Sequence, residues 1–195
     1  PPPGPFLSIS AGHVHTCGIQ VNGAVVCWGG ECDDCNTFGQ MNPPEGVFRS
    51  VSTSNRHSCA IRNDGSVHCW GRNAVGESTP PDGQFQSIST GYEHSCGIRD
   101  DDRVICWGSD QFLQVNALEI GFTSVSAGWY HTCGILQNGT VACWGAHNPD
   151  GQIVVPEGQF VAIDAGGAHT CGTRDDGSVL CWGNNDHGQG DVPTP

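Results

Sequence analysis

A stretch that runs from Phe6 to Gly29, FLSISAGHVHTCGIQVNGAVVCWG, decides the fold because it occurs five times in the chain. It returns as FRSVSTSNRHSCAIRNDGSVHCWG from Phe48, FQSISTGYEHSCGIRDDDRVICWG from Phe85, FTSVSAGWYHTCGILQNGTVACWG from Phe122 and FVAIDAGGAHTCGTRDDGSVLCWG from Phe160. The starts are 42, 37, 37 and 38 residues apart. Self-similarity at such a period indicates a repeat architecture.

The repeats divide the chain into five parts of similar length. We expect a single domain, residues 1–195, with repeats at about 6–47, 48–84, 85–121, 122–159 and 160–195 and with residues 1–5 completing the last spacer. The chain thus holds a whole number of repeats and is cut within a spacer. We therefore expect the repeats to form a ring, either alone or as part of a longer array or oligomer.

Each copy reads as short strands. Apolar and polar residues alternate over residues 6–11, and further strands are expected over 15–20 and 24–29. Asn22-Gly23 between the last two is a strong hairpin signal, whereas the third copy has Asp101-Asp102, and aspartate tolerates the left-handed backbone less well than glycine does. Gly39-Gln40 and its counterparts mark a short fourth strand. Four short strands per repeat predict an all-β fold, a five-bladed β-propeller with four antiparallel strands per blade.

Ten of the twelve cysteines form pairs that lie ten residues apart across these hairpins. A three-residue loop with glycine in third place pairs Gln20 with Ala24, and three steps along the ladder Cys17 then faces Cys27. Zinc ligands and reactive thiols are alternatives, but cysteines that bind zinc usually stand two to four residues apart. We expect five disulfides: Cys17–Cys27, Cys59–Cys69, Cys96–Cys106, Cys133–Cys143 and Cys171–Cys181.

The remaining two cysteines, Cys32 and Cys35, lie in the insertion that lengthens the first copy. A Cys-x-x-Cys pair can be half of a metal site or a redox pair. No second pair is left over to complete a zinc site, and the acidic neighbours oppose thiol reactivity. We expect a small local disulfide. Twelve paired cysteines in turn indicate an oxidising compartment, so we expect a secreted, extracellular or periplasmic protein.

Charge excludes several classes of function. The chain has 20 acidic residues against 7 basic ones, a net charge of −13, and all seven basic residues are arginine. Nucleic-acid binding and attachment to anionic membranes both need a cationic surface, so neither partner is expected. Without lysine there is also no P-loop and no Schiff base. No apolar run approaches the ~18 residues of a membrane span.

The repeat resembles the regulator of chromosome condensation family. The residues that carry the resemblance are Gly12–Thr16 and Cys27-Trp28-Gly29 with their four counterparts, of which the second copy has Ser54 in place of the turn glycine. The resemblance implies a β-propeller with four antiparallel strands per blade, although members typically have seven blades. The paired cysteines suit a secreted, disulfide-containing branch. The nearest functional analogy is the secreted propeller-type β-lactamase inhibitor proteins, which bind an enzyme with one face of the ring.

Two positions before each repeated histidine vary freely from copy to copy. In a propeller they recur once per blade on one face, where Trp129, Tyr130 and Tyr92 would be aromatic anchors and Arg56 a charged fork. The expected binding patch comprises His13, Val14, Asn55, Arg56, Tyr92, Glu93, Trp129, Tyr130 and Ala168. Ordinary exposed turn residues are the alternative. A protein is the expected partner, and lectin-like sugar binding, with Trp129 or Tyr92 stacking on a pyranose, is second.

The histidines themselves occupy one position in every copy: His15, His57, His94, His131 and His169. Five converging imidazoles could bind a metal, but strict repetition favours framework residues that bond within or between blades, so no metal or other cofactor is expected. The five repeated tryptophans are expected between blades. The chain has no Gly-x-Ser-x-Gly, His-Glu-x-x-His or unpaired cysteine, so we expect a binding protein and not an enzyme.

Overall fold

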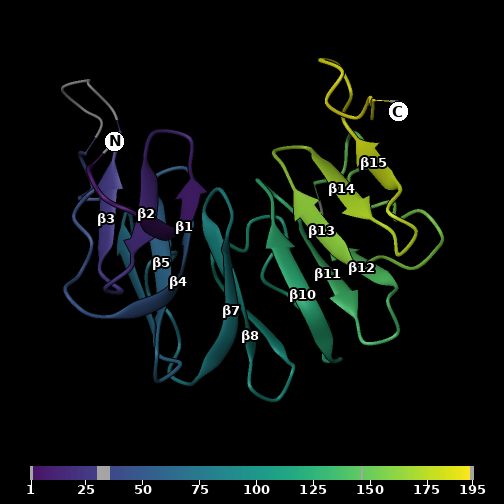
Figure 1. Cartoon of the computed structure of the whole chain (residues 1–195). Helices are drawn as coiled ribbons and strands as arrows, with labels where there is room; N and C mark the ends of the chain where they lie inside the picture. Colours follow the sequence, from purple (N-terminus) through teal and green to yellow (C-terminus); the bar gives the residue numbers. More distant parts are fainter. Residues whose placement is uncertain (1, 30–35, 146, 194–195) are drawn as a thin grey trace.

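Five antiparallel sheets of three strands each follow one another along the chain in a computed structural model, which describes residues 2–29, 36–145 and 147–193. Figure 1 shows the sheets in chain order along an arc, from the purple N-terminal sheet to the yellow C-terminal one. Each sheet corresponds to one sequence repeat and is one propeller blade. The described residues contain no helix of the length and apolar character that crossing a membrane requires.

Corresponding strands begin and end at nearly the same position of each repeat. The first blade contains β1 (Phe6–Ala11), β2 (Thr16–Gln20) and β3 (Val25–Trp28). The second and third contain β4 (Phe48–Thr53), β5 (His57–Arg62), β6 (Val67–Gly71), β7 (Phe85–Thr90), β8 (His94–Arg99) and β9 (Val104–Gly108). The last two contain β10 (Phe122–Ala127), β11 (Thr132–Leu136), β12 (Val141–Trp144), β13 (Ala162–Ala165), β14 (His169–Thr173) and β15 (Val179–Gly183).

The second and third strands of each blade form the expected hairpin. In the first blade Cys17 pairs with Cys27, and the Gln20 amide donates to the Ala24 carbonyl across the three-residue loop. All five hairpin disulfides are formed, with Cα atoms 4.0–4.1 Å apart. That spacing is close to the separation typical of a non-hydrogen-bonded pair, in which opposing side chains lie closest. Cys32 and Cys35 lie outside the described residues.

The fourth strand expected at each Gly-Gln segment is wrong, because these segments form turns. The side-chain oxygen of Gln114 accepts a hydrogen bond of 2.8 Å from the Phe112 amide, two residues earlier, and Gln40, Glu77, Gln152 and Gln189 accept the equivalent bond. The backbone donor is thus satisfied inside the turn and is not available to a ladder. Four of these five side chains are fully buried.

The core lies between consecutive blades. Cys17, Ile19 and Val25 of the first blade pack against Phe48, Ala60 and Trp70 of the second, and two equivalent clusters follow. Four of the five repeated tryptophans, Trp70, Trp107, Trp144 and Trp182, are therefore interblade residues. Each of these four donates from Nε1, over 2.9–3.1 Å, to the backbone carbonyl of the buried Gln or Glu of the preceding blade.

The first and last blades each have one face that no other described blade covers. Strand contacts link β1 to β4, β4 to β7, β7 to β10 and β10 to β13, so each first strand packs against the next along the inside of the arc. Ile9 on β1 is 66% exposed, whereas its counterpart Val51 packs into the core. Figure 1 shows the two termini on opposite sides of the arc. The described residues thus form an arc of five blades with two open ends, so this part of the chain does not by itself form the closed ring that the repeats predicted.

Candidate functional site

The first variable residue of every Gly-x-x-His turn lines one cavity. These turns connect the first and second strands of each blade, so they lie at one end of the inner strands. The cavity has a volume of about 520 Å³, and the turn residues that line it are His13, Asn55, Tyr92, Trp129 and Gly167. Backbone bonds hold adjacent turns together: the amide of His13 donates to the Ser54 carbonyl, and that of Trp129 to the Gly167 carbonyl.

The second variable residue contacts the loop of the preceding blade. The Arg56 guanidinium lies over the Phe38 ring, Glu93 binds Arg72, and Tyr130 packs against Phe112 with ring centroids 5.0 Å apart. Neighbouring residues of a tight turn point in different directions, so one position faces the cavity and the other its rim. Of the second set only Arg56 and Tyr130 also line the cavity, whereas Val14, Glu93 and Ala168 do not.

Aromatic side chains cluster on one side of the cavity. The Tyr92 ring lies 5.8 Å from that of Trp129 and 5.9 Å from that of Tyr130, measured between centroids. Phe112 and His147 extend the cluster beyond Tyr130. Such tilted arrangements are favourable for aromatic pairs. Trp129 nevertheless remains 49% exposed, which leaves a large apolar surface free at the mouth of the cavity.

A glycine in the last blade, Gly167, makes room for the indole ring of Trp129. A Cβ atom on Gly167 would stand only 3.0 Å from the indole ring. Contacts of this length are tighter than nine in ten real Cβ contacts, so a larger residue would require the indole to shift by a few tenths of an ångström. The position of Trp129 therefore depends on the turn of the following blade as well as on its own.

Arg72 connects two carboxylates at the rim. Its Nη1 atom lies 3.0 Å from Glu77 and 2.6 Å from Glu93. Glu77 has no exposed side-chain surface and replaces the glutamine that the other four copies have at this position. Burying a carboxylate is costly unless it is paired, and Arg72 supplies that pair. The pair also holds Glu93 beside the aromatic cluster.

Several residues of this surface lie outside the predicted patch: Phe38, Arg72, Phe112 and His147. All four belong to the spacers, where the copies differ in length and the repeat gives no alignment to follow. A signal was nevertheless present for two of them. Phe38 and Phe112 each stand two residues before the buried Gln of the turn, which fixes their place relative to the blade.

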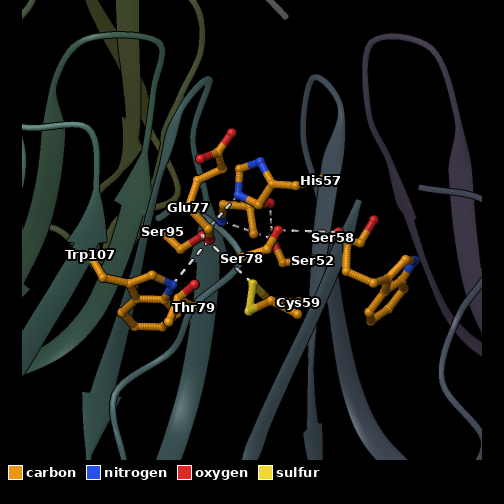
Figure 2. Close-up of a disulfide and its surroundings, with 12 residues drawn as sticks. Ser52, His57, Ser58, Cys59, Glu77, Ser78, Thr79, Ser95 and Trp107 are labelled. Carbon is orange, nitrogen blue, oxygen red and sulfur yellow. Dashed lines mark hydrogen bonds between the residues drawn. A yellow bond between two sulfur atoms is a disulfide. The ribbon is translucent and has the colours of Figure 1, made fainter. Parts of the chain in front are cut away.

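Four of the five repeated histidines bond to the next blade. Nε2 of His15, His57, His94 and His131 lies 2.7–2.9 Å from a hydroxyl oxygen, which belongs to Ser58, Ser95, Thr132 and Thr170 respectively. Figure 2 shows one such contact, with Ser95 between His57 and the Glu77 backbone carbonyl, to which Trp107 Nε1 also donates. Since the hydroxyl donates to the carbonyl, the neutral histidine donates from Nε2.

Burial keeps these histidines neutral. Desolvation lowers the pKa of His15, His57 and His131 to about 4 and that of His94 to about 3, from an ordinary value of 6.5. Protonation would also place a proton on Nδ1, which in His15, His94 and His131 is buried with no hydrogen-bond partner. The four rings are therefore framework residues.

This arrangement leaves the alternative of a histidine metal site without support. Within residues 2–29, 36–145 and 147–193 no three histidine, cysteine, aspartate or glutamate side chains are grouped so as to hold a metal ion. The imidazoles of His15, His57, His94 and His131 lie between blades, and each of these four uses Nε2 for a neighbour's hydroxyl. They do not converge on the cavity, whose lining includes none of them.

The repeats match a known family. The family model of the regulator of chromosome condensation (RCC1) repeat matches residues 48–77, 85–114, 122–152 and 160–189. The chain belongs to the RCC1-repeat family. No curated protein matches this RCC1-repeat chain in sequence.

Solved structures of similar fold include two plant receptor ectodomains. The CRINKLY WD40 ectodomain of the receptor kinase ACR4 from Arabidopsis thaliana is 31% identical, with a TM-score of 0.74 over 91% of this chain and 63% of its own. The ectodomain of the receptor kinase CR4 from Physcomitrella patens is 30% identical, with a TM-score of 0.80 over 99% and 56%. Prp20p from Saccharomyces cerevisiae shares the fold at 16% identity, with a TM-score of 0.79 over 97% and 59%. The RCC1-repeat chain spans less than two thirds of each of these proteins.

Proposed function

We propose that this protein is a secreted binding module that holds a protein partner on the face formed by its Gly-x-x-His turns. The observation that carries the proposal is the convergence of the variable turn residues on one cavity, with Trp129 half exposed at its mouth. Exposed aromatic residues beside a desolvated pocket are typical anchors of protein interfaces. The framework of histidines, tryptophans and disulfides repeats from blade to blade, while this face varies.

The compartment is inferred from two further observations. The five described disulfides need an oxidising environment in order to persist. The two receptor structures that are 30–31% identical to this chain are ectodomains. Both observations support an extracellular location.

The proposal is tested by capture of the partner with matched variants. Immobilised wild-type protein, a Trp129→Ala and Tyr130→Ala double variant, and an Ile120→Ala control are incubated with native extracellular fluid. We expect one protein to be retained in stoichiometric amounts by the wild type and the control and to be lost by the double variant. Ile120 is a suitable control because it is 44% exposed but lies outside the cavity. Unchanged capture by the double variant, or retention of glycans alone, would contradict the proposal.

A further inference from the structure

Arg56 differs from the other six arginines of the chain, all of which lie within the described ranges. Each of the other six has a hydrogen-bond or ion-pair partner: the carbonyl of Phe85 for Arg49, of Glu45 for Arg62, of Asp82 for Arg99 and of Glu157 for Arg174, and carboxylates for Arg72 and Arg103. Arg56 has neither kind of partner among the described residues, although the chain carries 20 acidic side chains. Its guanidinium is therefore available to a ligand.

Phe38 holds this free cation in place. The central guanidinium carbon of Arg56 lies 5.5 Å from the centroid of the Phe38 ring, at the mouth of the cavity. A guanidinium that stacks on an aromatic ring keeps its N–H donors at its edges, where they match the two oxygens of a carboxylate. Stacking also reduces the number of rotamers that the side chain must give up on binding.

Another part of the cavity lining is aromatic. Trp129 and Tyr92 form it, and Trp129 has nearly half of its surface exposed. Glu93, the nearest acidic neighbour of this cluster in sequence, is bound to Arg72 and does not line the cavity. The cavity thus offers one free cation and one aromatic surface, and its volume of about 520 Å³ lies in the range of ligand pockets.

We propose that the ligand is an acidic segment of the protein partner, with a carboxylate at Arg56 and a bulky apolar side chain on Trp129 and Tyr92. This inference rests on the proposed function and specifies its chemistry. The carboxylate belongs to an aspartate or glutamate side chain or to the end of a chain. The net charge of −13 does not oppose this, because interactions between exposed charges more than ~8 Å apart are largely screened at physiological ionic strength.

Synthetic peptides test the assignment. The probes are acetylated, amidated Gly-Phe-Glu-Gly-Gly, the same peptide with Gln or Lys in place of Glu, the same peptide with Ala in place of Phe, and acetylated Gly-Gly-Gly-Phe with a free carboxyl end. Binding is followed by NMR titration of the ¹⁵N-labelled protein, using the Arg56 side-chain and Trp129 indole signals. The variants are Arg56→Gln and, as a charge-matched control, Arg103→Gln, whose arginine is exposed and lines no part of the cavity.

We expect the Glu peptide to shift both signals and to bind about tenfold more tightly than the Gln peptide, since a hydrogen bond to a charged group contributes about that much. The Arg56→Gln variant should lose this preference, and the Arg103→Gln control should keep it. A stronger response to the free carboxyl end would identify a chain end as the source of the carboxylate.

Equal or stronger binding of the Gln or Lys peptide would overturn the assignment. So would the absence of shifts at Arg56 and Trp129 under every peptide of the series. Either result leaves the proposed function standing if partner capture still depends on Trp129 and Tyr130, so the two proposals fail separately.

Discussion

Nε2 of His94 lies 2.9 Å from the Thr132 hydroxyl of the next blade, and this hydroxyl lies 3.1 Å from the Gln114 carbonyl, to which it donates. The hydrogen bonds thus run from the histidine of one blade through the hydroxyl of its neighbour and back to the first blade. The same three groups recur at the two adjacent interfaces. Because the histidine takes part as a neutral donor, the stability of the protein depends on its protonation.

Stability should fall when the pH drops below 6.5. The pKa of these four buried histidines is lowered to about 3–4 in the folded protein, so below pH 6.5 the unfolded chain binds protons that the folded one does not. The histidine contribution is therefore complete above about pH 7 and is lost towards pH 4, at up to about 1.4 kcal/mol per pH unit for each histidine.

Urea denaturation at pH 7.5, 6.0 and 5.0 measures this dependence. A His94→Gln variant keeps an N–H donor near the Nε2 position but does not titrate. The slope of the unfolding free energy against pH should therefore be up to a quarter smaller in this variant than in the wild type. An equal slope in the variant and the wild type would mean that His94 does not contribute to the pH dependence of stability.

Removing Arg72 should destabilise the folded protein only while residue 77 remains a glutamate. Arg72→Ala leaves the fully buried Glu77 with the Val75 amide as its remaining bond, at an expected cost of about 2–4 kcal/mol in the free energy of unfolding. Glu77→Gln should change stability by less than about 1 kcal/mol, because glutamine occupies this position in the other four copies and a neutral amide needs no ion pair.

The double variant completes the cycle. Chemical denaturation of Arg72→Ala with Glu77→Gln should recover most of the loss, since no buried charge is then left without a partner. If the double variant instead loses as much stability as the two single variants together, the ion pair is not the reason that Arg72→Ala is destabilising.

A glycine at position 102 should stabilise the third hairpin. Asp102 adopts a left-handed backbone with φ of 65°, whereas the equivalent glycines of the other copies have φ of 82–86° at no steric cost. Asp102→Gly removes this strain but also two exposed hydrogen bonds, of 2.9 Å from Gln137 and 3.4 Å from Gln86, so we expect a net gain of about 0.5–1 kcal/mol. Thermal denaturation measures the gain. The reverse exchange, Gly139→Asp, should destabilise, and a stabilised Gly139→Asp would contradict the argument.

The Cys171–Cys181 disulfide should be reduced before the others. Cys17, Cys59, Cys96 and Cys133 are fully buried under the next blade, but Cys171 lies at the open end and is only half buried. Limited reduction followed by alkylation and peptide mapping should label Cys171 and Cys181 first. Loss of this disulfide should cost up to about 3 kcal/mol, the value for a short closed loop. Uniform labelling of all pairs would show that the blades do not protect them.

The sequence predicted the blade well where one repeated spacing determines the geometry. The ten-residue separation of Cys17 and Cys27 around Asn22-Gly23 is compatible with one register, and the structure has that register. The fourth strand was wrong because a repeated Gly-Gln segment does not distinguish a short strand from a turn in which a side chain such as that of Gln114 satisfies the backbone. The candidate patch was predicted as one set of nine residues at equivalent positions of the five turns. In space they form two sets, one that lines the cavity and one that contacts the loop of the preceding blade, because the side chains of neighbouring turn residues point in different directions.

The histidine–hydroxyl–carbonyl contacts join each blade only to its immediate neighbours, so the protein has the energetics of a linear array. In such an array local opening starts at the ends, and amide hydrogen exchange becomes slower towards the middle. Tyr92 and Trp129 belong to the third and fourth blades, each covered on both sides by a neighbour. The aromatic side of the cavity is therefore built on the part of the molecule that opens least.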